Sequence, residues 1–256
     1  MWPIKLLWIS SMFSLVALIA YSLTTLDFTY LIISIFYYYI ISILGNTICY
    51  HRYLSHRTFE TDSFRKTILL IANFLTGQGS IFYAVSMHRH HHKHSDTDLD
   101  VHSSHSSYFN NFFFSLRSFD FFTKEKKVRP AFDLMRDKQI MFLHNYYVIL
   151  WIATITVLLT LSWKFVIFVL LSSVGLITLH TNFVRTFLSH NNIMSSYRNF
   201  KTDDYSVNST MQFLSLGEAL HNNHHANPST GNQAINQKEF DPVWMFIEKF
   251  LKVNHK

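Results

Sequence analysis

The sequence predicts an all-α integral membrane protein with four transmembrane helices and a cytosolic helical cap. Three observations predict this fold class: the composition, the lengths of the uncharged stretches and the distribution of the basic residues. Hydrophobic residues make up 49% of the 256 residues and charged residues 15%, so the chain is more apolar than an ordinary soluble domain. No linker-like stretch divides it, and we expect residues 1–256 to form one domain.

Five uncharged stretches reach the roughly 20 residues that a membrane-spanning helix needs. We expect four of them to cross the membrane, at about 6–26, 28–50, 145–163 and 165–184. The fifth stretch, 67–87, has polar or helix-weakening residues in its centre, namely Asn73, Gly77, Gln78 and Gly79. Such residues are unfavourable within the hydrocarbon layer, so we expect 67–87 to be an interfacial or re-entrant segment.

The basic residues indicate the orientation of the chain. With four spans, 13 of the 22 Lys and Arg residues fall in 51–144 and 7 fall in 185–256, whereas Lys164 lies between the last two spans. Basic residues accumulate on the cytosolic side of a membrane. The protein should therefore be multi-pass, with 51–144 and 185–256 in the cytosol and the lipid bilayer as a partner. These flanking residues account for the net charge of +6, and we expect no nucleic-acid partner.

Histidines cluster at the cytosolic ends of the predicted spans. The motif HRYLSH begins at His51, five histidines lie within seven positions of SMHRHHHKHSD at 86–96, and HNNHH begins at His221. The spacing i, i+3, i+4 places three side chains on one face of a helix. It occurs twice, in His88, His91 and His92 and again in His221, His224 and His225. Each trio can therefore direct several imidazoles at one point, whereas His90 points away and should be a bystander.

Two further positions complete the pattern. His51 and His56 are five residues apart, and an α-helix would splay them by about 140°, so we expect the chain to leave its helix between them. His190 follows the last predicted span and can add another nitrogen. Structural zinc takes about four ligands. A larger set of histidines on one side of the membrane therefore indicates two metal ions.

The ligand type narrows the choice of metal. The single cysteine, Cys49, argues against thiolate zinc sites and iron–sulfur clusters and should be a packing residue. A two-metal, imidazole-rich site at a membrane surface fits iron and dioxygen chemistry best, while copper and zinc stay open on ligand type alone. Metal-bound imidazoles also need acceptors for their second nitrogen. The candidate acceptors are Asp96, Asp98, Asp100, Asp204 and Glu218, with Asp98 and Glu218 favoured.

Three stretches of the sequence carry a family resemblance. HRYLSHRTF, HRHHHKHSDTDLDVHS and GEALHNNHHANP resemble the three histidine boxes of membrane fatty-acid desaturases, in particular the Δ9 acyl-CoA and bacterial acyl-lipid branch, stearoyl-CoA desaturases among them. The match covers roughly 40–250 and includes EFDPVWMFI after the last box. Four residues separate the histidines of the first box, as in the desaturase branch, whereas alkane hydroxylases and sterol oxidases usually have three.

The resemblance implies a cofactor, a ligand set and a reaction. The cofactor is two iron ions, and the ligands are His51, His56, His88, His91, His92, His190, His221, His224 and His225. The implied reaction inserts a cis double bond, at Δ9, into a long-chain acyl-CoA or acyl-lipid. It uses O2 and two electrons from a separate donor such as cytochrome b5 or a ferredoxin with its reductase. No catalytic residue beyond the metal ligands is implied, and the substrate-binding residues are unknown.

The resemblance also adds two residues that should support the ligands. Thr186 stands where the family often has an asparagine that reaches a metal through water, and His102 lies at a position where a histidine recurs after the second box. Two alternatives stay open. One is a hydroxylase or ketolase on the same di-iron scaffold. The other is a histidine-rich metal-binding or transport protein, which would place ionisable residues within the spans rather than at their ends.

Overall fold

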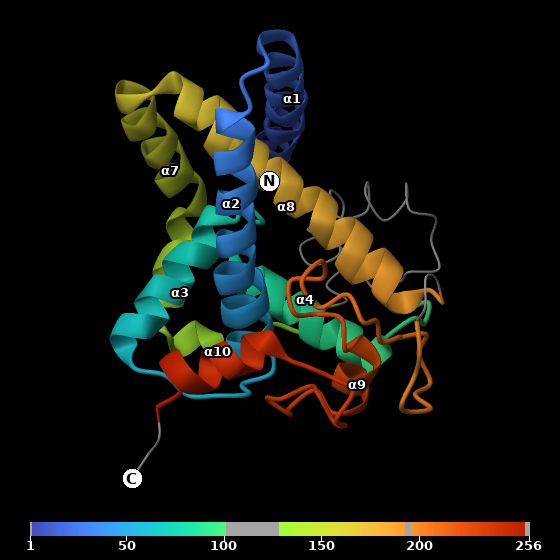
Figure 1. Ribbon diagram of the computed structural model, residues 1–256. Helices are drawn as coiled ribbons and strands as arrows, with labels where there is room; N and C mark the ends of the chain where they lie inside the picture. Colours follow the sequence, from blue (N-terminus) through green and yellow to red (C-terminus); the bar gives the residue numbers. More distant parts are fainter. Residues whose placement is uncertain (1, 101–127, 193–195, 254–256) are drawn as a thin grey trace.

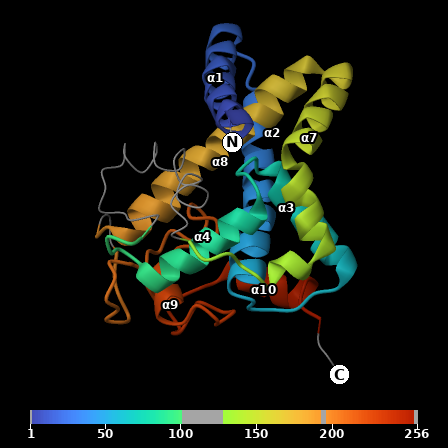
Figure 2. The ribbon, with the colours of Figure 1, turned by 180° about the vertical axis from the view of Figure 1, so that it is seen from behind.

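A computed structural model describes residues 2–100, 128–192 and 196–253, except for the side chains of 2 and 185–187. This part of the chain is helical and contains no β-strand (Figures 1 and 2). The α-helices are α1 (Trp2–Thr25), α2 (Thr29–Ile41), α3 (Ser63–Leu75), α4 (Ile81–His94), α7 (Lys138–Leu161), α8 (Ser172–His180), α9 (His221–Ala226) and α10 (Pro242–Phe250). The π-helices are η1 (Ser42–Ser55), η3 (Phe165–Leu171) and η4 (Thr181–Phe187), and the 3-10 helices are η2 (Leu134–Arg136) and η5 (Leu188–His190).

Four continuous helices are long and apolar enough to cross a membrane. They are Pro3–Thr25, Thr29–Ser55, Lys138–Leu161 and Phe165–His190. The predicted all-α fold with four candidate membrane helices is thereby confirmed. Both views place the α1–α2 turn and the turn after α7 at one end of the molecule, and α4, α9 and α10 at the other (Figures 1 and 2). The histidine motifs lie on or beside the elements of this second end.

The second candidate span is longer than the sequence predicts, because it continues as the π-helix η1 through Ser55. The backbone N–H of His56 donates to the carbonyl of His51 at 3.2 Å, a hydrogen bond between residues i and i+5. In such a turn, residues five apart lie on the same side of the helix. The expectation that the chain leaves its helix between His51 and His56 is therefore wrong: a wider helix aligns the two side chains.

The stretch 67–87 forms parts of two helices, α3 and α4, separated by a turn in which Gly77 and Gly79 have positive φ angles of 71° and 92°. Neither helix is among the candidate spans. Its polar residues make contacts inside the protein: the Asn73 side chain donates to the Gly45 carbonyl at 3.0 Å, and Gln78 donates to Thr178 at 2.9 Å. The turn is thus held by the second and fourth candidate spans rather than exposed in mid-membrane.

Helix α3 has two faces of different character. Phe64, Ile68 and Ile71 are exposed and follow the i, i+4, i+7 spacing of a single stripe. The opposite face, which includes Leu69 and Leu70, is buried in an apolar core shared with η1, α4 and α10. This core lies directly behind the histidine-bearing ends of η1 and α4 and fixes their positions relative to each other.

Candidate metal centre

Four elements at the lower end of Figure 1 supply the nine histidines. The π-helix η1 carries His51 and ends before His56, and α4 carries one trio. The short helix η5 carries His190, and α9 carries the second trio. The structure gathers these side chains into two groups, within each of which the candidate ligand atoms lie within 4.8 Å of one another. The five-histidine group is His51, His56, His88, His92 and His224, and the four-histidine group is His91, His190, His221 and His225.

Each trio is divided between the two groups. In α4 the residues i and i+4, His88 and His92, join the five-histidine group, whereas the i+3 residue His91 joins the other. In α9 the division is reversed, since the i+3 residue His224 joins the five-histidine group. Residues four apart on an α-helix differ by about 40° in direction, and residues three apart by about 60° the other way. We expected each trio to direct its imidazoles at one point. Instead, each trio contributes histidines to both groups.

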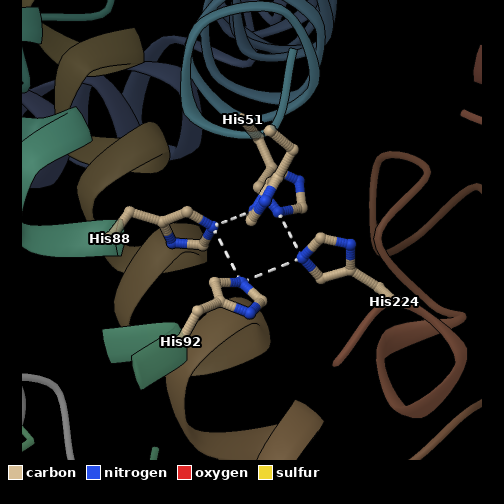
Figure 3. A group of neighbouring side chains, drawn as sticks. His51, His88, His92 and His224 are labelled. Carbon is tan, nitrogen blue, oxygen red and sulfur yellow. Dashed lines mark hydrogen bonds between the residues drawn. The ribbon is translucent and has the colours of Figure 1, made fainter. Parts of the chain in front are cut away.

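In the five-histidine group the Nε2 atoms converge (Figure 3). Nε2 of His88 lies 2.7 Å from that of His56 and 3.1 Å from that of His92. Nε2 of His224 lies 2.9 Å from that of His51 and 3.0 Å from that of His92. In the four-histidine group, Nε2 of His190 lies 3.0 Å from Nε2 of His221. The side chains thus direct their nitrogens at two shared points, and such nitrogens commonly bind metal ions.

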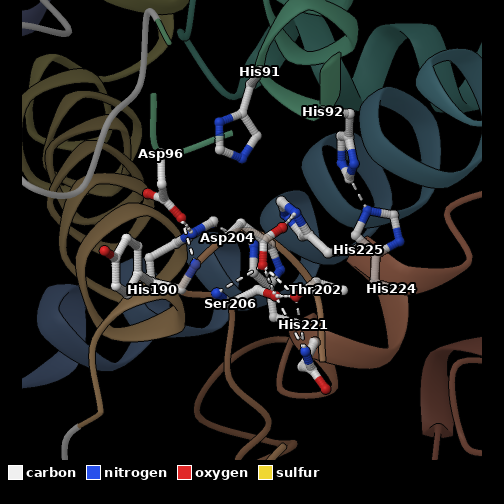
Figure 4. Close-up of polar contacts among 12 residues, drawn as sticks. His91, His92, Asp96, His190, Thr202, Asp204, Ser206, His221, His224 and His225 are labelled. Carbon is white, nitrogen blue, oxygen red and sulfur yellow. Dashed lines mark hydrogen bonds and ion pairs between the residues drawn. The ribbon is translucent and has the colours of Figure 1, made fainter. Parts of the chain in front are cut away.

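Carboxylates hold the opposite nitrogen of four of these rings. Nδ1 of His51 lies 2.7 Å from Glu218, and the two residues are almost fully buried. Three further pairs of this kind join His91 to Asp100 at 2.9 Å, His190 to Asp96 at 2.7 Å, and His225 to Asp204 at 2.6 Å (Figure 4 shows the last two). A carboxylate that accepts from Nδ1–H fixes the tautomer in which Nε2 has a free lone pair. These four rings are therefore oriented as metal ligands.

The histidine nitrogens that face each other show whether a metal ion fits between them. With Nδ1–H donated to Asp96, Nε2 of His190 has a lone pair, and it faces Nε2 of His221. Nε2 of His225 is buried without a hydrogen-bond partner among the described residues, while its Nδ1 faces Asp204. Buried polar atoms are normally paired, and a cation bound by such lone pairs would satisfy them. The residues present therefore fit a metal ion in each group.

Burial keeps five of these imidazoles neutral. It lowers the pKa of His88, His92, His221 and His224 well below the ordinary value of 6.5, with repulsion among the rings adding to the effect. Burial also lowers the pKa of His225 to about 3, although the hydrogen bond to Asp204 acts in the opposite direction. A neutral imidazole is the form that binds metal. These five imidazoles are therefore in the metal-binding form at neutral pH.

Two arginines join the elements that carry the histidines. The Arg52 guanidinium is fully buried and donates to Asp241 at 2.8 Å, to the Gly217 carbonyl at 3.0 Å and to the Gly231 carbonyl at 3.1 Å. It thereby connects η1 to the segment before α9 and to the start of α10. An ion pair this deeply buried leaves an uncompensated charge if either partner is lost.

Arg89 connects α4 to the end of η1. Its guanidinium donates to the carbonyls of Leu54 and Ser55 at 2.7 and 3.0 Å, and to Asp133 at 2.7 Å. The last carbonyls of a helix have no partner within the helix, so Arg89 satisfies two of them. Sequence reasoning did not assign these roles, although each arginine directly follows the first histidine of its motif, and that position is the signal that could have indicated them.

A comparison with protein families decides the relationship. The model of the family described as fatty acid desaturase matches residues 6–237.

The chain belongs to the fatty acid desaturase family.

Curated relatives agree with this assignment. This chain is 30% identical over 212 residues to the sn-1 stearoyl-lipid 9-desaturase of Synechocystis sp.. The aligned region covers 82% of this chain and 65% of the relative. It is 28% identical over 249 residues to the protein of the same description from Anabaena variabilis, covering 94% and 89% of the two chains. It is 28% identical over 228 residues to the Delta-9 acyl-lipid desaturase 2 of Arabidopsis thaliana, covering 84% and 70%. This chain thus spans just under two thirds of the Synechocystis relative.

The acidic candidates of this desaturase-family chain have different outcomes. Glu218 and Asp96 contact the rings of His51 and His190. Asp98 is exposed, and the favoured assignment to it is corrected, because the turn after α4 directs Asp100 back to His91 instead. Asp100 and Asp204, weighed less by sequence reasoning, both contact histidines, and acidic residues in tight turns beside a histidine motif were the available signal.

The other predicted residues are His90, His102 and Thr186. His90 contacts the Leu99 carbonyl at 3.0 Å, and its ring lies tilted against that of His94 with the ring centres 4.6 Å apart, as expected of a bystander. His102 lies outside the described residues, and so does the side chain of Thr186.

A largely apolar cavity of about 440 Å³ adjoins the four-histidine group. It lies between the second and fourth candidate spans and the loop before α9, and its lining includes Tyr38, Phe183, Val207 and Leu214. Ser189, the neighbour of His190 in the chain, also lines it. The volume lies within the range of small-molecule sites. The cavity therefore offers an apolar ligand a place beside the histidines, on the side of the membrane helices.

Proposed function

We propose that this chain is a fatty-acyl desaturase that inserts a cis double bond into a long acyl chain. The observation that carries the proposal is the pair of neighbouring histidine groups, in which neutral imidazoles converge and carboxylates hold their outer nitrogens. Such a set suits two iron ions, for which the nine histidines would be the ligands. Together with O2 and two electrons, the iron ions would supply the oxidising power that an unactivated methylene requires.

The protein's own residues bind and orient in this proposal. The histidines hold the metal ions, and Glu218, Asp96, Asp100 and Asp204 fix the direction of four of the rings. No acid or base is needed at the reacting carbons, because a methylene has no proton acidic enough for general base catalysis. We therefore assign no catalytic residue beyond the metal ligands.

The apolar cavity is the proposed place of the acyl chain. It extends from Ser189, beside His190, to the Tyr38–His180 pair, in which the tyrosine hydroxyl contacts Nδ1 of His180. A long acyl chain fits this lining because most of its surface is apolar. The relatives named as 9-desaturases of lipids support Δ9 as the position of the new double bond, with either an acyl-lipid or an acyl-CoA as substrate.

The proposed setting is a membrane crossed four times, with the histidine end in the cytosol. The apolar stripe of α3 at Phe64, Ile68 and Ile71 would rest in the membrane interface, with Arg65 and Lys66 at its polar end. The clustering of basic residues on the histidine side supports this orientation. A separate donor such as cytochrome b5 or a ferredoxin with its reductase would deliver the two electrons from the same side.

The test is the fatty-acid profile of a desaturase-deficient host that expresses the chain, measured by gas chromatography with location of the double bond. We expect a new monounsaturated acid. The His92→Ala variant should abolish it, because His92 is one of the five convergent ligands, and the matched His90→Ala variant should leave it unchanged. A hydroxylated acid would instead assign the chain to the hydroxylases. Full activity of His92→Ala would contradict the metal assignment.

A further inference from the structure

The two histidine groups differ in the charge that surrounds them. Among the described residues, one carboxylate, Glu218, contacts a ring of the five-histidine group. Three carboxylates contact rings of the four-histidine group, which are Asp96, Asp100 and Asp204. With one divalent ion in each group, the first ion and its nearest carboxylate would have a net charge of +1. The second ion and its three carboxylates would have a net charge of −1.

The three carboxylates of the four-histidine group are fixed in place by further hydrogen bonds. Asp96 also accepts from the backbone N–H of Tyr205 at 2.9 Å, and Asp100 accepts from the backbone N–H of Asp96 at 2.8 Å. Asp96 adopts a left-handed φ of 58°, a conformation that aspartate tolerates better than most residues. One turn after α4 thus directs two carboxylates at two histidines of the same group.

Asp204 has the same kind of support. It accepts from the Thr202 and Ser206 hydroxyls at 2.6 Å and from the Ser206 backbone N–H at 3.1 Å, in addition to His225 (Figure 4). Arg198 lies 3.8 Å from its other side and offsets part of its charge. Hydrogen bonds from several donors stabilise the ionised form of a carboxylate. The negative charge of Asp204 is therefore a constant part of the site.

Three arginines lie near the histidines of the five-histidine group. Arg89 donates to the carbonyls of Leu54 and Ser55, directly before His56, and it shares a single carboxylate, Asp133, with Arg57. Two positive charges face one negative charge there. Arg52 beside His51 is matched one to one by Asp241 and adds no net charge. The surroundings of the five-histidine group are thus more positive, and those of the four-histidine group more negative.

We propose that the two metal positions are unequal, and that the four-histidine group stabilises the more highly charged ion of the pair. A carboxylate behind an imidazole raises the basicity of that ligand, and such partners typically change metal affinity by about 10- to 100-fold. Three such partners act on one group and one acts on the other. When one electron is removed from a pair of ferrous ions, the ferric ion forms in the four-histidine group. The inference rests on the proposed two-metal function but concerns the order of oxidation, not the product.

The experiment uses the full-length protein loaded with two equivalents of ferrous iron-57 under anaerobic conditions. Ferricyanide takes up one electron per equivalent, and Mössbauer spectra give the ferric fraction and identify which site it occupies. We expect one ferric and one ferrous site after one equivalent. Asp204→Asn should make the first oxidation at least tenfold less favourable, a shift of about 59 mV for one electron. It should also change the spectrum of the ferric site.

Glu218→Gln is the matched control, because it removes the one carboxylate of the five-histidine group and leaves the other three. It should change the ferrous signal and the second oxidation, with the first oxidation unshifted. Asp96→Asn and Asp100→Asn give independent replacements should Asp204→Asn fail to fold.

Two results would overturn the inference. One is oxidation of both ions at a single potential, and the other is a shift of the first oxidation by Glu218→Gln but by none of the three aspartate variants. Fewer than two iron ions bound per chain would refute both this inference and the proposed di-iron function. Unequal oxidation in a protein that forms no double bond would refute only the proposed function.

Discussion

The helices that carry histidines and those that do not are built differently. The two candidate spans without proposed ligands, α1 and α7, are regular α-helices along their whole length. The two that carry proposed ligands contain π-helical stretches, η1 in the second span and η3 and η4 in the fourth. A π-turn inserts one extra residue and is often found at functional sites. In η1 and η4 the departure from α-geometry lies at or just before a proposed ligand, whereas η3 lies at the far end of its span.

The packing of these helices differs in the same way. Helix α7 exposes Ile149, Ile152 and Val157, which suits a surface that faces lipid. The π-helix η1 instead buries a run of polar residues, with Asn46 and Thr47 near its middle and Arg52 near its end. Regular helices can slide and rotate at small cost when their surface is uniform. The π-helix η1 is more constrained, because Thr47 and Arg52 donate to the carbonyls of Leu216 and Gly217 in the segment before α9.

The largest expected effect comes from changing the helical register by one residue. The change should disrupt a π-helix that carries proposed ligands and be tolerated in a regular α-helix. Deletion of Tyr53 from η1 leaves His51 and His56 four residues apart and shifts the Leu54 and Ser55 carbonyls away from Arg89. We expect loss of metal from the five-histidine group and loss of activity. Insertion of one alanine after Leu159, at the exposed end of α7, is the control and should preserve metal content. Metal analysis of the purified proteins measures both, and retention of two ions by the deletion variant would contradict the comparison.

The next largest effect should come from the buried ion pair of η1. Arg52→Met leaves Asp241 buried without its partner, and we expect a loss of about 3–5 kcal/mol in the free energy of unfolding. Arg52→Met combined with Asp241→Asn should recover part of that loss, because no lone charge stays buried. Ile149→Ala on α7 is the lipid-facing control and should change stability by less than about 0.5 kcal/mol. Denaturation in detergent micelles measures all three, and an equal loss for Arg52→Met and Ile149→Ala would contradict the prediction.

A smaller effect should follow at the closest approach between η1 and α3. A Cβ at Gly45 would lie 2.7 Å from the Ala72 carbonyl oxygen and 2.7 Å from the Thr76 methyl group. Gly45→Ala must therefore separate the two helices, and overpacking of this kind destabilises by about 1–3 kcal/mol. Ala153→Leu on the exposed side of α7 adds more volume and should have little effect. Thermal unfolding of both variants sharpens the comparison, and a neutral Gly45→Ala would show that η1 can move.

The last prediction changes the pH rather than the sequence, and its effect grows gradually as the pH falls. Histidines whose pKa is lowered by folding, such as His92 and His225, take up protons more readily when the chain is unfolded. Their contribution to stability is complete above about pH 6.5 and falls by about 1.4 kcal/mol per pH unit for each histidine below it. For His225 this loss continues down to its folded pKa of about 3. Denaturation in detergent micelles between pH 7.5 and 5 measures this loss, and a free energy of unfolding that stays constant to pH 5 would contradict the predicted burial of these histidines.

Much of this architecture is local and can therefore be read from the sequence. The four apolar stretches are long enough to predict four helices, since hydrophobic length alone decides that question. The i, i+3, i+4 spacing in α4 and α9 predicts a shared helix face, because it follows from helix geometry. Asn73, Gly77, Gln78 and Gly79 similarly indicate that 67–87 does not cross the membrane as one helix.

Other features depended on contacts between distant segments, and the tertiary structure alone decided them. The division of each trio between two groups depends on where η5 and η1 place His190 and His51. The choice of Asp100 over Asp98 depends on a turn closed by hydrogen bonds, and the π-helix of η1 depends on packing against α3. The sequence by itself determined which residue types were available and on which helix face they lie. Two of the four carboxylate–ring pairs, Asp96 with His190 and Glu218 with His51, were set only when segments more than 90 residues apart came together.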